Sequence, residues 1–190
     1  MAEVKKNIIT QGMSGKLGDT IVFRLVNGKT IVAAKPALSD KEPSHSQKSH
    51  RERFQEAVIY ARHILQDAGL KSVYQEAASS KPGVSAYNIA VADFFGAPDI
   101  QEIDLSQYTG QAGDPIVVKV TDDFKVAKVR VEIYNPDGSL VEQGEAVKTT
   151  DGLRWLYSAT AVNDTLDGDK ILIKAYDIPG NQDVQEQSLG

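Results

Sequence analysis

The chain contains no cysteine, so it has neither a disulfide framework nor a thiolate nucleophile. It has no apolar run near the roughly 20 residues that a membrane-spanning helix requires. Its first ten residues lack the long apolar core of a secretory signal peptide. These absences predict a cytoplasmic protein by default, or one that is part of an assembled or exported particle.

The chain has fewer positively charged residues than negatively charged ones. The 190 residues include 21 Lys and Arg against 26 Asp and Glu, which gives a formal net charge of −5. Because nucleic-acid binding depends on clustered positive charge at the phosphates, nucleic acid is not an expected partner. At 41% hydrophobic and 25% charged residues, the composition is that of a globular protein with one or two domains.

Signatures of catalysis are scarce, and no nucleophile-elbow motif is present. Three histidines occur at spacings that predict surface positions rather than a metal pair: His45, His50 and His63. Gly15 and Lys16 resemble the end of a phosphate-binding loop, but that loop needs a glycine where Thr10 stands and Ser or Thr where Leu17 stands. The sequence therefore predicts a protein that is not an enzyme and needs no cofactor.

A β-hairpin is predicted near the N-terminus. Two apolar runs, residues 20–26 and 29–34, flank an Asn-Gly pair at 27–28. Asn-Gly favours the type I′ turn, because both central residues of that turn need a positive φ. The turn fixes a register in which Phe23 pairs with Val32.

Helical periodicity follows the hairpin. Apolar residues three and four apart predict a helix over residues 47–68, which ends at Gly69 as its C-cap, and a second over 70–78. Ser85 is predicted to cap a third helix, and Gly96-Ala97-Pro98 ends it. Because strand alternation begins here, a domain boundary is predicted between residues 98 and 99.

The second half predicts a β-sandwich. From residue 100 onward, short strands alternate with turns about every ten residues. Residues 126–134 alternate most cleanly between apolar and charged side chains, and further strands are predicted over residues 139–147 and 170–177. The predicted fold class is an α+β N-terminal domain, a β-hairpin plus about three helices over residues 1–98. An all-β immunoglobulin-like sandwich of seven strands over residues 99–190 follows it.

The second half also resembles bacterial immunoglobulin-like modules. Three features carry this resemblance: Thr121-Asp122-Asp123 before the strand 126–134, the lone Trp155, and Asp177-x-x-Gly180-Asn181. The resemblance covers residues 99–190 and implies a disulfide-free sandwich. Such modules serve as spacers, adhesion units and virion decorations, so the resemblance implies a fold and leaves the role open.

The first half resembles an uncharacterised bacterial family. The residues that carry this resemblance are Ser14-Gly15-Lys16-Leu17-Gly18-Asp19, then Gly28-Lys29, then Gln47 with Arg51, Arg53 and Phe54. The match implies a shared architecture and no particular reaction.

Four residues form a candidate calcium site: Asp122, Asp123, Asp177 and Asn181. In a sandwich, the ends of the second and penultimate strands can lie at one pole, and calcium prefers hard oxygen ligands. The alternative is that these side chains only stabilise turns through hydrogen bonds to nearby backbone. A second acidic group, Asn163, Asp164, Asp167 and Asp169 around Gly168, predicts a turn.

The predicted role is that of a non-catalytic structural or interaction protein. In this interpretation the N-terminal unit docks into an assembly by self-association or on a protein partner, and the immunoglobulin-like module is displayed. Two alternatives stay open: a carbohydrate- or cell-surface-binding module, and a metal-dependent enzyme that uses the scattered acidic residues.

Overall fold

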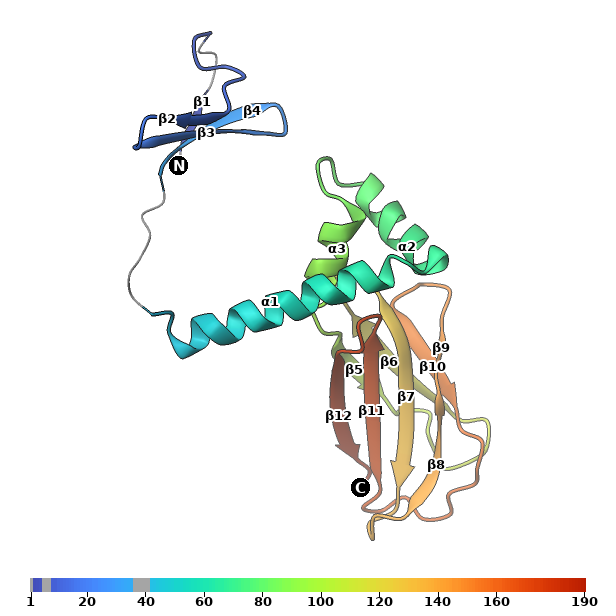
Figure 1. The fold of residues 1–190 in the computed structure, drawn as a ribbon. Coiled ribbons are helices and arrows are strands. Elements are labelled where there is room, and N and C mark those ends of the chain that lie inside the picture. Colours follow the sequence, from blue (N-terminus) through green and yellow to red (C-terminus); the bar gives the residue numbers. More distant parts are fainter. Residues whose placement is uncertain (1, 5–7, 36–41) are drawn as a thin grey trace. The chain divides into compact units, whose positions relative to one another are not determined.

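A computed structural model describes residues 2–4, 8–35 and 42–190 (Figure 1). The chain divides into two compact units, Met1–Arg53 and Phe54–Gly190. The helices from Phe54 onward thus belong to the same unit as the strands that follow them. The predicted domain boundary between residues 98 and 99 says which segments fold independently, and it stays a prediction. In the part of the chain that is described, no helix combines the length and apolarity needed to cross a membrane.

The first unit contains a four-stranded antiparallel sheet in the order β1-β4-β3-β2. Its strands are β1 (Ala2–Val4), β2 (Gly15–Leu17), β3 (Ile21–Val26) and β4 (Lys29–Ala34). The predicted hairpin is formed by β3 and β4, and the predicted pairing of Phe23 with Val32 is confirmed. Asn27 and Gly28 both have positive φ, 50° and 76°, as a type I′ turn requires.

Three helices follow: α1 (His45–Ile64), α2 (Ala68–Ser79) and α3 (Ala86–Asp93). The first begins earlier than predicted, because Ser44 and Gln47 exchange hydrogen bonds in a capping box. The prediction of Gly69 as a C-cap is wrong. Gly69 lies in the first turn of α2, whose N-cap is Asp67, and the Asp67 side chain accepts a hydrogen bond from the Leu70 N–H. The prediction that Ser85 caps α3 is confirmed.

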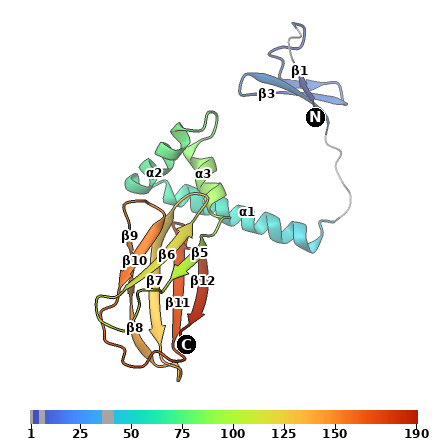
Figure 2. The same cartoon turned by 180° about the vertical axis from the view of Figure 1, so that it is seen from behind.

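The helices pack around a small core of their own within the second unit. Ala61, Tyr74, Ile89 and Ala90 are buried in it. Phe124, from the turn between the second and third strands of the sandwich, joins this core and stacks on Tyr74 with ring centroids 4.7 Å apart. One end of the sandwich therefore packs against the helices, and both views show α2 and α3 at that end (Figures 1 and 2).

The sandwich consists of two antiparallel four-stranded sheets, β5-β6-β10-β9 and β12-β11-β7-β8. The first sheet contains β5 (Asp99–Asp104), β6 (Pro115–Thr121), β9 (Val147–Lys148) and β10 (Arg154–Ser158). The second contains β7 (Val126–Tyr134), β8 (Leu140–Glu145), β11 (Lys170–Asp177) and β12 (Gln182–Ser188). When the eight strands are lettered A, B, C, C′, D, E, F and G in chain order from β5 to β12, the two sheets have the orders A-B-E-D and G-F-C-C′. This is the arrangement of immunoglobulin-like folds, so the predicted fold class is confirmed.

The sandwich has eight strands rather than the predicted seven. The single strand predicted over residues 139–147 is two, β8 and β9, which belong to opposite sheets. The chain changes sheets at Ala146, which is buried and still donates a hydrogen bond to the Val129 carbonyl. Trp155 is 7% exposed and lies in the core between the sheets.

Candidate functional site

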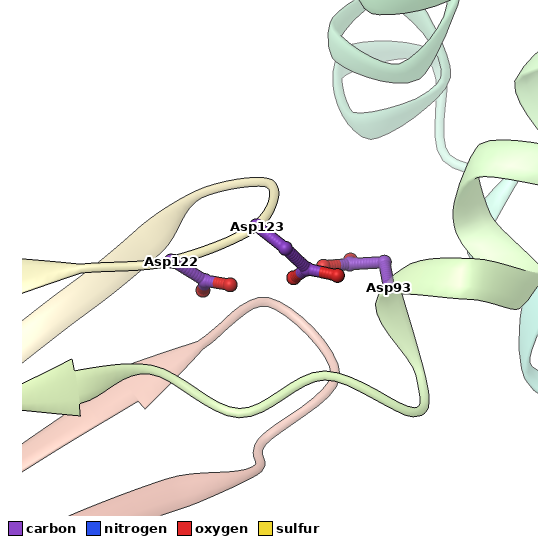
Figure 3. A group of neighbouring side chains, drawn as sticks. All are labelled: Asp93, Asp122 and Asp123. Carbon is purple, nitrogen blue, oxygen red and sulfur yellow. The ribbon is translucent and has the colours of Figure 1, made fainter.

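Three carboxylates converge where the helical layer meets the sandwich. Asp93 ends α3, and Asp122 and Asp123 follow β6 in the turn to β7. In Figure 3 their side chains point toward one another from these two elements. One oxygen of each lies within 4.8 Å of an oxygen of the others. We call these three residues the carboxylate cluster.

Asp93 is held in place by a tyrosine relay. It is 2% exposed, and its Oδ2 accepts a hydrogen bond of 2.5 Å from the Tyr74 hydroxyl. The Tyr74 hydroxyl lies 2.9 Å from that of Tyr60 on α1. The relay therefore links all three helices to the carboxylate cluster.

The electrostatics of the carboxylate cluster disfavour full ionisation. Burial, together with the charges of Asp177, Asp122 and Asp123, raises the pKa of Asp93 to about 7 against the opposing hydrogen bond from Tyr74. Burial and the neighbouring Asp123 raise the pKa of Asp122 to about 6. Three carboxylates this close share protons or attract a cation, because like charges in a poorly solvated place repel.

The turn after β6 sets the positions of Asp122 and Asp123. Asp122 Oδ1 accepts a hydrogen bond of 3.3 Å from the Phe124 N–H, which tightens the turn. Asp123 lies against Gly96, where an added Cβ would stand 2.5 Å from Asp123 Oδ1. A glycine at position 96 therefore gives the Asp123 carboxylate room to reach the carboxylate cluster.

Asp177 ends β11 and Asn181 lies in the turn before β12, next to the carboxylate cluster, but both Asp177 oxygens and Asn181 Nδ2 are engaged in hydrogen bonds. Asp177 Oδ1 accepts from the Gly180 N–H at 2.7 Å, and its Oδ2 accepts from Asn181 Nδ2 at 2.7 Å. Asn181 Nδ2 also donates to the carbonyl oxygens of Gly96 and Phe94, at 2.6 and 3.3 Å. Asp177 and Asn181 thus connect the end of β11 to the segment after α3, and we call these two residues the clasp.

Among the described residues, the other predicted ones do not belong to this cluster. His45, His50 and His63 are exposed on α1. Lys16 lies in strand β2, which leads into strand β3 and not into the helix that a phosphate-binding loop needs. In the second acidic group, Asn163 and Asp169 are buried and hydrogen-bonded at 2.6 Å, while Asp164 and Asp167 are exposed.

The sequence prediction named Asp122 and Asp123 but missed Asp93. A signal was available: an Asp in the last turn of an otherwise apolar helix opposes the helix dipole, which favours positive charge at that end. Such a residue needs a compensating partner, and Tyr74 and the turn after β6 surround it. That the partners come from elements far apart in sequence could not be read from spacing alone.

No family model matches this chain, and no curated protein matches its sequence. Among solved structures, a tetra-tandem repeat in the extending region of a large adhesion protein is similar at 17% identity and a TM-score of 0.32. The match covers 50% of this chain and 24% of that one. The chain thus spans about a quarter of the length of the structure that it matches.

Proposed function

We propose that this protein is a non-catalytic interaction protein whose N-terminal sheet docks on a protein partner, with the immunoglobulin-like sandwich displayed beyond it. The observation that supports this is a row of exposed apolar side chains on one face of the sheet. Leu17, Ile21 and Leu25 are 60%, 36% and 53% exposed.

Register places these three side chains on one face. Leu17 pairs with Ile21 across β2 and β3, and Ile21 and Leu25 are four residues apart on one strand. Phe23 lies between them and is 9% exposed. We call Leu17, Ile21 and Leu25 the apolar row. Burying a fully exposed side chain of this kind contributes roughly 1.5–3 kcal/mol, and these three, 36–60% exposed, would each contribute about half of that, so this row favours association with an apolar surface.

The opposite face of the same strands mixes charged and apolar side chains: Val22 and Val26 share it with Arg24 along β3, and Val26 is 49% exposed. Arg24 and Lys16 point to that side, because they alternate with Leu25 and Leu17 along β3 and β2. The outer strand β2 is exposed along its whole length and is only three residues long. An edge this short offers few backbone groups for strand pairing, so the apolar row rather than the edge carries the proposed contact.

The test compares two single substitutions on adjacent residues of β3. Leu25→Ser removes a member of the apolar row, and Arg24→Ser changes the opposite face of β3 with a similar loss of side-chain volume. Sedimentation of the full chain is measured both after purification and in an extract of its native cells. We expect wild-type and Arg24→Ser protein to sediment as a complex in at least the extract, and Leu25→Ser to sediment as a monomer.

Two outcomes contradict the proposal. One is a wild-type chain that is monomeric in both settings. The other is equal behaviour of the two variants, which would mean that the apolar row is not the contact. Circular dichroism confirms beforehand that both variants keep the β-sheet and helical signals of the wild type.

A further inference from the structure

The carboxylate cluster contains buried oxygens that the protein itself leaves unsatisfied. Asp93 is 2% exposed, yet its Oδ1 has no hydrogen-bond partner, and Asp122 Oδ2 is also buried without one. An unsatisfied buried polar atom costs about 1–3 kcal/mol, and more when it is charged. Most such atoms in native proteins have a partner, so these two oxygens call for one.

None of the ion pairs described for the second unit supplies that partner. Within the described residues, the ion pairs of the second unit involve Glu132, Asp151 and Glu186, and none reaches the carboxylate cluster. The cluster therefore has a deficit of positive charge that either protons or a cation must offset.

The donor set suits calcium among the biological cations. All three residues offer carboxylate oxygens, which hard cations prefer, and no imidazole or thiolate is part of the group. Calcium accepts irregular coordination and fills its remaining positions with water. A cavity of about 230 Å³, lined by Lys81, Asn88, Asp93 and Asp123 among others, leaves room for that water beside the carboxylates. Lys81 lines this cavity without forming an ion pair with any of the three described carboxylates.

We propose that Asp93, Asp122 and Asp123 bind one calcium ion, which fastens the end of α3 to the turn between β6 and β7. The ion satisfies the two unpartnered oxygens and neutralises the repulsion between carboxylates. Asp177 and Asn181 hold the turn after β11 beside the ion without ligating it. Calcium would thereby make the junction between the helical layer and the sandwich rigid.

The experiment measures calcium binding to the full chain after removal of metals with a chelator. Calcium is titrated while thermal unfolding is followed, and terbium is used as a luminescent substitute because Tyr74 next to Asp93 can sensitise it. The test variant is Asp123→Asn, since Asp123 is exposed and its change should leave the fold intact. The control is Asp164→Asn, an exposed residue in the second acidic group.

We expect saturating calcium to raise the unfolding temperature of the wild-type chain by about 5 °C or more. Asp123→Asn should weaken binding at least tenfold, while Asp164→Asn should bind as the wild type does. The proposal is overturned if the wild type shows neither a calcium-dependent shift nor terbium luminescence. Equal weakening in the two variants, or binding of magnesium without calcium, overturns it as well.

This test is independent of docking by the N-terminal sheet. The ligands all lie in the second unit, and the readouts are metal affinity and unfolding temperature rather than association. A chain that binds calcium but stays monomeric supports this inference and contradicts the proposed function.

Discussion

Glu142 should be the most sensitive polar position of the sandwich. It lies on β8 and is 7% exposed. Its Oε2 accepts hydrogen bonds from the Tyr157 hydroxyl of β10 at 2.8 Å, from the N–H and hydroxyl of Thr160, and from the Ala161 N–H. Burial raises the pKa of Glu142, but these hydrogen bonds outweigh burial and leave the pKa below its usual range. One ionised carboxylate thus joins the two sheets.

The expected magnitude follows from the donors that lose their acceptor. Glu142→Ala strands the buried Tyr157 hydroxyl and the backbone donors, and it should cost roughly 3–5 kcal/mol of unfolding free energy. Glu142→Gln keeps a neutral acceptor and should cost roughly 1–2 kcal/mol, because charge-assisted hydrogen bonds are about twice as strong as neutral ones. Glu145, exposed on the same strand, provides the control as Glu145→Gln, with a change within about 0.5 kcal/mol.

The assay is urea unfolding followed by the fluorescence of Trp155, the single tryptophan, which lies in the core of the sandwich. At a urea slope of about 2 kcal/mol per molar, Glu142→Ala should lower the midpoint by about 2 M. A loss below about 0.5 kcal/mol for Glu142→Ala would refute the reasoning. So would a loss for Glu145→Gln that equals it.

Three further predictions concern close packing, the clasp and pH. Gly144→Ala should destabilise the sandwich by roughly 1–3 kcal/mol in urea unfolding, since a Cβ would stand 2.6 Å from the Tyr157 ring; an unchanged midpoint contradicts this. Asn181→Ala removes the hydrogen bonds that hold the carbonyl oxygens of Phe94 and Gly96, so the backbone there should open more often and its amide hydrogens should exchange faster. Unchanged exchange at residues 94–96 counts against the clasp. With a chelator present, the free energy of unfolding should fall as pH rises from about 5 to 8. Asp93 has a pKa of about 7 in the folded state and 3.8 in the unfolded state, so the folded state holds a proton that the unfolded state has lost. Asp93→Asn should flatten that slope, and stability that rises over this range would contradict the sign.

Local signals in the sequence predicted the strands and turns well. The Asn-Gly pair fixed both the turn and the register of the hairpin, because only a few residues tolerate positive φ at both positions. The strands 126–134 and 170–177 were visible because their inward faces are uniformly apolar. Where the pattern is weaker the prediction was wrong: the change of sheet at Ala146 depends on tertiary pairing, which periodicity over residues 139–147 does not encode.

The candidate site could be predicted only in part for the same reason. Asp122 and Asp123 stand in a turn that composition reveals, but their partner Asp93 comes from a helix about thirty residues earlier. Asp177 and Asn181 were correctly placed near that pole, yet the structure engages them with the backbone of residues 94–96. Which oxygens stay unsatisfied depends on packing, and packing is a property of the folded chain.

The most direct test of the central claim is site-specific photo-crosslinking in the native cell. A photoreactive phenylalanine analogue replaces Leu25 in one chain and the adjacent Arg24 in another, so the two probes differ only in the face of β3 that they occupy. Docking through the apolar row predicts crosslinks to one defined protein, or to a second copy of the chain, from position 25 and few from position 24. Equal crosslinking from both positions, or none from position 25, would contradict it.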